Sequence, residues 1–155
     1  MTNTKEPALF LGRFQPLHNG HVRVIRSLLL HHVRVVVGIG YSQEKNEKNP
    51  YSLACRRAML TNVFGKKISV IAIRDRYGNK EWTQELLHKA KGVKYLYYGP
   101  GQWESVYKKT GLMLRKVPRY DGISATMIRR RLHKSMPVEG LVPEEIIELV
   151  RNNFP

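Results

Sequence analysis

Two histidines in a glycine-containing segment near the start of the chain could together bind a phosphate group. The segment covers residues 12–21, with the sequence GRFQPLHNGH, and the histidines are His18 and His21. Imidazole N–H groups donate hydrogen bonds to phosphate oxygens. Gly12 and Gly20 let the backbone approach a ligand closely, because glycine has no side chain. We therefore expect both imidazole rings to point at one phosphate.

The chain around this segment predicts the elements that position it. Residues 8–11, ALFL, form an apolar run typical of a buried strand, and apolar residues recur at helical spacing from Val22 onward. The segment is therefore expected to be a strand-to-helix turn, with His18 in the turn and His21 in the first turn of the helix. A helix N-terminus favours an anion, because its backbone N–H groups are unpaired and the helix dipole is positive there.

An ordinary connection with polar loop histidines is the alternative interpretation of such a pair. The complete pattern, G-x-F-x-P-x-H-x-G-H, is far more specific than two isolated histidines. It resembles the signature of the nucleotidyltransferase superfamily that contains adenylyl- and cytidylyltransferases. With Arg13 and Gln15 in place, it is most similar to the archaeal type of adenylyltransferase that acts on nicotinamide mononucleotide (NMN). The resemblance implies catalytic roles for His18, His21 and Arg13, and nucleotide contacts for Gly12, Phe14 and Gly20.

A second pattern that could bind phosphate lies in residues 123–132, ISATMIRRRL. Ser124 follows an Asp-Gly turn signal and is well placed as the N-cap of a helix. The first turns of that helix would present the hydroxyls of Ser124 and Thr126 together with Arg129. A solvated helix is the alternative for this segment taken alone. The pattern resembles the I-S-x-T-x-x-R element with which the superfamily holds the β- and γ-phosphates of its nucleotide. This implies a catalytic role for Arg129, and it leaves open whether the two arginines that follow contact substrate.

A weaker match in the middle of the chain resembles the NMN branch of the superfamily. In that branch a basic residue and an aromatic residue precede a helix that bears an arginine, as Lys48, Tyr51 and Arg57 do here. The resemblance implies that Lys48 and Arg57 contact the substrates.

Residues 75–82, DRYGNKEW, are similar to the D-x-x-x-N-x-x-W segment of the same branch. The resemblance implies that Asn79 contacts the substrates and that Trp82 stacks on the nicotinamide ring. A core or interface aromatic is the alternative role for Trp82. Residues 98–101, YGPG, depart from the family pattern in the loop on the adenosine side, where Gly99 is the expected contact.

The composition favours one strongly basic domain. The chain has 155 residues, and we expect all of them to form a single nucleotidyltransferase domain, with residues 1–7 and the last few residues loose. It has 27 Lys and Arg against 12 Asp and Glu, which gives a formal net charge of +15 and favours polyanionic partners. A basic nucleic-acid-binding module is an alternative function. No zinc-ligand set and no aromatic RNA-binding sheet motif accompanies the charge, so nucleic acid is the less favoured partner.

Cysteine content and hydropathy exclude several other classes. Cys55 is the only cysteine, which rules out an intrachain disulfide and a cysteine-rich zinc site. No apolar stretch approaches the roughly 20 residues that span a bilayer. The start of the chain does not resemble a signal peptide. We therefore expect a soluble, cytoplasmic protein with no membrane partner.

Strand-like and helix-like segments alternate along the chain, which predicts an α/β fold. We expect a single Rossmann-like domain in which a five-stranded parallel sheet carries helices on both faces. Ligands of such sheets bind beyond the carboxyl ends of the strands, where the strand order switches. The first strand leads directly into residues 12–21. The expected strands are residues 8–11, 33–39, 68–73, 93–98 and 112–117, and the helices between them cover residues 22 onward, 52–64, 82–90 and 102–108.

The resemblance implies an enzyme that transfers AMP from ATP to NMN, giving NAD and pyrophosphate. It also implies a Mg²⁺ ion, small-molecule substrates and a homo-oligomer. The sequence shows no set of carboxylates for the ion, so substrate and water would hold most of it. A relative acting on phosphopantetheine, flavin mononucleotide or a phosphoalcohol, with ATP or CTP as donor, is the alternative. Arg13, Gln15, Asn79 and Trp82 favour NMN.

Overall fold

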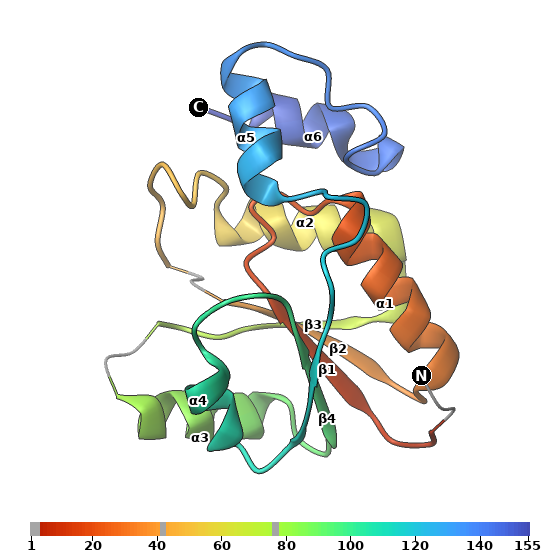
Figure 1. The fold of residues 1–155 in the computed structure, drawn as a ribbon, viewed down its shortest axis with the longest axis vertical. Coiled ribbons are helices and arrows are strands. Elements are labelled where there is room, and N and C mark those ends of the chain that lie inside the picture. Colours follow the sequence, from red (N-terminus) through yellow and green to blue (C-terminus); the bar gives the residue numbers. More distant parts are fainter. Residues whose placement is uncertain (1–3, 41–42, 76–77) are drawn as a thin grey trace.

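The computed structural model describes residues 4–40, 43–75 and 78–155 and has a central parallel sheet (Figure 1). The sheet has five strands in the order β3-β2-β1-β4-β5, and every neighbouring pair is parallel. The predicted α/β class and five-stranded parallel sheet are confirmed. The strands are β1 (Ala8–Gly12), β2 (Val35–Ile39), β3 (Ser69–Ala72), β4 (Tyr95–Tyr98) and β5 (Met113–Lys116).

The strand order switches at β1, the central strand of the sheet. The chain first adds β2 and β3 on one side of β1 and then returns to add β4 and β5 on the other side. In register, Leu11 lies opposite Gly38 of β2 and Tyr98 of β4. A Cβ on Gly38 would lie 2.5 Å from Cδ2 of Leu11, so a larger residue at this position would force the Leu11 side chain to move. The carboxyl end of β1 therefore opens at the point where α/β sheets bind their ligands.

Helices cover both faces of the sheet, as predicted (Figure 1). Helices α1 (Asn19–His31) and α2 (Leu53–Phe64) pack on one face, and α3 (Asn79–Lys89) packs on the other, with α4 (Glu104–Lys108) beside it. Helices α5 (Ala125–His133) and α6 (Ile147–Asn152) lie at the end of the molecule away from α3 and α4 (Figure 1). Among the described residues, none of the helices combines the length and the apolar composition needed to cross a membrane.

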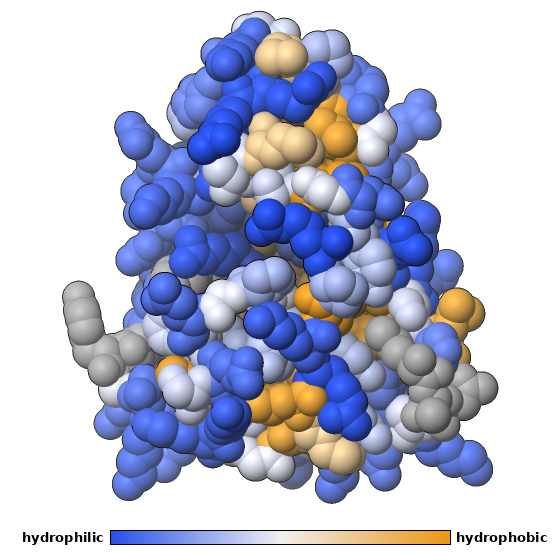
Figure 2. All heavy atoms as spheres, in the orientation of Figure 1, coloured by the Kyte–Doolittle hydropathy of each residue, from blue (hydrophilic) through white to orange (hydrophobic). Residues whose placement is uncertain are grey.

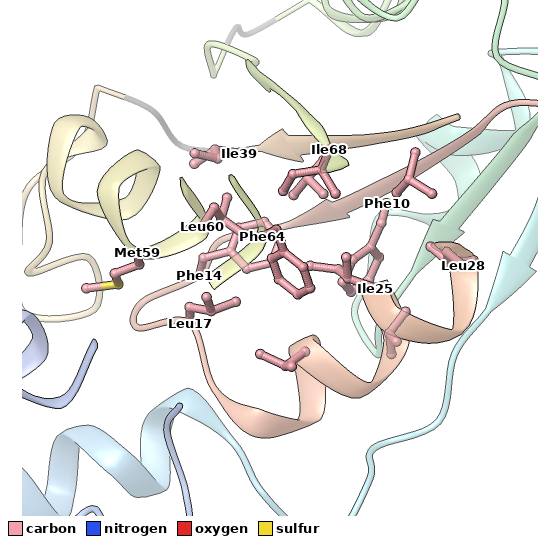
Figure 3. Packing of buried hydrophobic residues seen from close by; sticks show 14 of the residues in the cluster. Phe10, Phe14, Leu17, Ile25, Leu28, Ile39, Met59, Leu60, Phe64 and Ile68 are labelled. Atoms are coloured by element: carbon pink, nitrogen blue, oxygen red, sulfur yellow. The ribbon is translucent and has the colours of Figure 1, made fainter. Parts of the chain in front are cut away.

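Alternating side chains along each strand divide the core between the two faces. Phe10 and Val37 contribute to the larger cluster with α1 and α2, whereas Leu9 and Val36 contribute to the cluster with α3. Both faces of β2 are therefore buried, which explains why its sequence is a continuous apolar run. Figure 3 shows the larger cluster, in which Phe10, Phe14, Leu17, Ile25, Leu28, Met59, Leu60 and Phe64 pack together.

The end of the chain forms a third, smaller core against the start of α1. Ile128 of α5 packs with Val138 and Val142, and the following loop contacts the helix that carries the histidines. The backbone N–H of Asn19 donates to the carbonyl of Leu141 (2.9 Å), and its side-chain amide donates to the carbonyl of Gly140 (2.9 Å). The C-terminal segment therefore supports the N-terminus of α1.

Some helix boundaries and chain termini differ in the structure from what the sequence predicts. Helix α3 begins at Asn79, three residues before the expected start. Residues 4–7 are tied down, since the N–H of Thr4 donates to the carbonyl of His31 and Pro7 accepts from Lys94; residues 1–3 lie outside the description. At the other end, the Phe154 ring packs 4.8 Å from that of His133. Figure 2 shows hydrophilic side chains over most of the viewed face, in keeping with the charge.

Candidate active site

A cavity of about 550 Å³ lies at the carboxyl ends of β1 and β4, where the strand order switches. Its walls come from the turn between β1 and α1, the loop after β4 and the N-terminus of α5. It brings together most of the site residues expected from the sequence. These are Gly12, Arg13, Phe14, His18, Gly20, His21, Lys48, Trp82, Gly99, Ser124, Thr126 and Arg129.

The two histidines cap the helix that they begin. His18 is the N-cap of α1, and its Nδ1 accepts a hydrogen bond from the backbone N–H of His21 (3.3 Å). In return, Nδ1 of His21 accepts from the backbone N–H of His18 (3.3 Å). The rings stack with their centroids 3.6 Å apart and an interplanar angle of 19°. A Cβ on Gly20 would lie 3.0 Å from the His18 ring, so glycine makes room for this stack.

This reciprocal capping fixes where each ring carries its proton. Burial, together with the charge of Arg119, lowers the pKa of His18 from 6.5 to about 4. Desolvation and His18 lower the pKa of His21 well below 6.5. Both rings are therefore neutral at pH 7, and a neutral ring that accepts at Nδ1 has its proton on Nε2. Each ring can thus donate one Nε2–H hydrogen bond to a ligand.

Ring packing by Phe14 and hydrogen bonds of Gln15 fix the position of the turn before the histidines. Phe14 is buried, has a φ of 53° and packs edge-on against the His21 ring with centroids 4.8 Å apart. The Gln15 side chain pairs with the backbone of Tyr51: its Nε2 donates to the carbonyl (3.0 Å) and its Oε1 accepts from the N–H (2.9 Å). Gln15 therefore joins the turn to the segment that precedes α2.

The N-terminus of α5 faces the same cavity. Ser124 is the N-cap, as predicted, and its hydroxyl accepts from the N–H of Met127 (3.2 Å). Arg129 donates to the carbonyl of Gln15 (2.8 Å) and to the hydroxyl of Thr126 (3.4 Å). Burial and the charge of Arg13 lower the pKa of Arg129. Two guanidinium groups thus share one side of the cavity, an arrangement that an anion between them would stabilise.

Two adjacent arginines of α2 have different surroundings, and Arg57, which the resemblance assigns to the substrates, is not the one that contacts the turn between β1 and α1. Arg57 donates to the carbonyl of Val70 in β3 and does not line the cavity. Arg56 is fully buried, and its Nη1 donates to the carbonyls of Arg13 and Gly40, both at 3.0 Å. Burial lowers the pKa of the Arg56 guanidinium to about 10. The signal was the buried side of α2: Arg56 lies one helical turn before Leu60 and therefore faces inward.

The two residues expected to contact the acceptor are separated in the structure. Trp82 is half-buried, lines the cavity and lies 5.9 Å from the ring of Tyr107, whereas Asn79 is exposed at the start of α3 and does not line it. Arg76 and Tyr77, in the same predicted segment, lie outside the described residues. The cavity wall also includes Asp75, Trp103 and Arg119. In the sequence, Asp75 is identified only as part of the D-x-x-x-N-x-x-W pattern, and no role is assigned to Trp103 or Arg119.

The donor groups of the cavity suit a metal ion that arrives with its nucleotide. Within the described parts of the chain, no three His, Cys, Asp or Glu side chains are grouped as a metal site. Asp75 is the one carboxylate among the described residues of the wall, in a cavity otherwise lined by cationic, aromatic and neutral side chains. Phosphate oxygens and water would therefore supply most ligands of a divalent cation here.

Two solved structures of one protein are among those that have the same fold. A bifunctional NMN adenylyltransferase/ADP ribose pyrophosphatase from Francisella tularensis aligns with a TM-score of 0.73 at 21% sequence identity. The same protein, complexed with AMP and a manganese ion, aligns with a TM-score of 0.71 at 20% identity. The alignment covers 97% of this chain but 53% of that one, so the chain spans about half the length of the bifunctional protein.

Sequence relatives define the family more narrowly. Residues 9–131 match the cytidylyltransferase-like family. The nicotinamide-nucleotide adenylyltransferase of Thermococcus kodakarensis is 30% identical over 152 residues, which cover 92% of this chain and 81% of the relative. The enzyme of the same name from Methanolobus tindarius is 28% identical over 149 residues, covering 92% and 86%. The chain therefore belongs to the cytidylyltransferase-like family, and within it to the nicotinamide-nucleotide adenylyltransferases of archaeal type.

Proposed function

We propose that the protein transfers AMP from ATP to NMN, giving NAD and pyrophosphate. A 5′-phosphate oxygen of NMN attacks the α-phosphorus of ATP in line, and the bond from that phosphorus to the bridging oxygen of the β-phosphate breaks. A phosphate monoester is already a competent nucleophile at neutral pH, so the protein needs no strong general base. It must instead position two anions that repel each other and stabilise the charge that grows on the leaving pyrophosphate.

The observation that carries this proposal is the convergence of two capped helix N-termini on one cavity. At α1, neutral His18 and His21 each offer an Nε2–H, which can donate to oxygens of the reacting phosphate. At α5, Arg129 and the hydroxyls of Ser124 and Thr126 face the same space, where they would hold the β- and γ-phosphates with Arg13. The positive ends of both helix dipoles favour the same anion.

The acceptor end of the cavity is aromatic. Trp82, Tyr98 and Tyr107 all line it, and the rings of Tyr98 and Tyr107 lie 5.0 Å apart. The nicotinamide of NMN is a flat, positively charged ring that an indole face attracts. We assign Trp82 to this ring, Lys48 to the substrate phosphates and Gly99 to the adenosine side.

A magnesium ion bound with ATP would polarise the phosphates and neutralise part of the charge on the leaving group. Asp75 is the side chain of the cavity best suited to hold water around such an ion.

An assay of the purified protein against a small panel of acceptors tests the proposal. ATP and Mg²⁺ are supplied with NMN, flavin mononucleotide, phosphopantetheine or a phosphoalcohol, and pyrophosphate release is measured. We expect release with NMN far above that with the other acceptors, together with one NAD per pyrophosphate. Release with another acceptor in preference to NMN would contradict the assignment and would identify the related activity instead.

Cytoplasmic localisation and homo-oligomeric assembly, both expected from the sequence, stay predictions. Light scattering of the purified protein measures the assembly directly, and a monomer at micromolar concentration would contradict it.

A further inference from the structure

A second cavity, of about 440 Å³, runs along α5 beside the candidate active site. We call it the α5 groove. Four cationic side chains line it: Arg119, Arg130, Arg131 and Lys134. None of the described residues of its wall is acidic, and none is aromatic. The proposed adenylyl transfer uses no residue that belongs to this groove alone.

The four cations line one groove, and no carboxylate is among the described residues of its wall. Arg131 is fixed in place, since its Nε donates to the carbonyl of Pro137 (2.6 Å). The acidic side chain of the preceding loop, Asp121, pairs with Arg23 of α1 instead (3.5 Å). Like charges gathered in this way repel each other, and a multiply charged anion would relieve the repulsion.

The groove is continuous with the active-site cavity. Arg119, Ser124 and Thr126 line both. Arg119 lies near enough to His18 for its charge to lower the pKa of that ring. The groove therefore adjoins the end of the active-site cavity that is formed by the N-terminus of α5.

We propose that the α5 groove is a second binding site, for a linear polyphosphate. The inference rests on the proposed function in one respect: the pyrophosphate released by adenylyl transfer is one source of this ligand, and free longer polyphosphate is the other. Helix α5 has nine residues and is thus about 13 Å long, which suits a short chain of linked phosphates. A single-stranded nucleic acid fits less well, because the groove has no aromatic side chain on which bases could stack.

Titration calorimetry with tripolyphosphate tests the site without any need for catalysis. We expect wild-type protein to bind two equivalents, one in the active-site cavity and one in the groove. The double variant Arg130→Ala/Lys134→Ala should bind one, because both residues are exposed in the groove and outside the active-site cavity. The variant Lys66→Ala/Lys67→Ala, which removes the same charge from the exposed turn before β3, should still bind two.

Several outcomes overturn the proposal. One equivalent in the wild type means that the groove is only solvated surface, and two equivalents in the Arg130→Ala/Lys134→Ala variant place the second site elsewhere. If that double variant does not fold, as judged by circular dichroism, Lys134→Glu alone should weaken the second equivalent at least tenfold. A single-stranded oligonucleotide that binds the wild type in place of tripolyphosphate, and not the groove variant, would assign the groove to nucleic acid.

Inhibition of NAD formation distinguishes the two sources. If pyrophosphate occupies the groove as well as the active site, its inhibition should be mixed with respect to ATP, and it should become purely competitive in the groove variant. If only tripolyphosphate behaves in this way, the ligand is a longer polyphosphate from outside the reaction. A chain that binds two equivalents but makes no NAD would refute the proposed function and leave the groove established.

Discussion

At the scale of single residues, the two histidines that cap their own helix are also the proposed donors to the reacting phosphate. Each Nδ1 is taken by a backbone N–H of the partner residue, so each Nε2 must carry the proton. Desolvation keeps both rings neutral before substrate arrives. The capping arrangement therefore selects the tautomer that can donate from Nε2 to a phosphate oxygen, and it does so through backbone N–H groups.

Removal of one ring should slow the reaction strongly. His21→Ala deletes a donor to the reacting phosphate, and loss of one such donor costs roughly 100-fold in kcat. Steady-state kinetics measures this, with His31→Ala as the control, since His31 lies at the far end of the same helix. Near-normal kcat in His21→Ala would remove that ring from the mechanism.

The choice of NMN as acceptor should depend on Trp82. Loss of the indole face removes a stacking and cation–π contribution of about 0.5–2 kcal/mol. Trp82→Ala should therefore raise the KM for NMN by roughly 3- to 30-fold, since about 1.4 kcal/mol is a factor of ten. The KM for ATP should change much less, and Trp82→Phe should recover part of the loss. A rise in the KM for ATP instead would place Trp82 on the adenine side.

At the scale of elements, the site is a junction of three connections. The turn before α1, the loop after β2 and the N-terminus of α2 meet at Arg56, which is wholly buried and binds carbonyls of the first two. The same turn is joined to α5 through the bond from Arg129 to Gln15. Positions of catalytic groups are therefore set by hydrogen bonds between loops, in addition to the packing of helices on the sheet.

Substitutions of the two adjacent arginines of α2 should lower the free energy of unfolding by clearly different amounts. Arg56→Met keeps the volume but leaves two carbonyls without their guanidinium partner, and we expect a loss of at least about 1–3 kcal/mol in the free energy of unfolding. Arg57→Met should cost about 1 kcal/mol or less, because it removes one bond at a half-exposed side chain. Urea denaturation measures both. Equal losses would show that Arg56 is not the structural link.

Element types were predictable from the sequence, whereas the links between elements were not. Alternating apolar runs identify all five strands, and Ser52 and Ser124 cap the helices expected of them. Helical spacing from Leu60 marks Arg56 as inward-facing, but the carbonyls that it binds could not be predicted, because they depend on how α2 is rotated against the sheet. It also assigned Asn79 to the substrates, whereas α3 begins at this residue and leaves it exposed outside the cavity.

At the scale of the whole molecule, part of the excess positive charge of the chain lines two adjoining cavities. The net charge is +15, and both cavities described above are lined by arginines. Neutral histidines in the middle of this region avoid adding further positive charge. The stability of the molecule should therefore depend on keeping those rings unprotonated.

As the pH is lowered, the free energy of unfolding should begin to fall before the Asp and Glu carboxylates become protonated. The pKa of His18 is about 4 in the folded chain and 6.5 as its ordinary value, so the unfolded chain binds more protons between these limits. The free energy of unfolding should then fall as the pH is lowered from 6.5 towards 4. The part due to His18 is about 3 kcal/mol, at about 1.4 kcal/mol per pH unit.

Urea denaturation at several pH values between 4 and 7.5 measures this slope. His18→Asn retains a side chain that caps helices well and removes one titrating ring, so its slope should be clearly shallower. An unchanged slope would show that His18 is not the group responsible.

During translation, the turn that carries the histidines is synthesised long before the residues that hold this turn in place. Asn19 is bound by the carbonyls of Gly140 and Leu141, and the hydroxyl of Tyr51 donates to the carbonyl of Val150 (2.9 Å). The strands of the sheet can pair during synthesis, but the start of α1 lacks its support until residues 140 and 141 have emerged, and Tyr51 lacks its partner until residue 150 has. The proposed phosphate-binding turn therefore has all of these contacts only after residue 150 has left the exit tunnel.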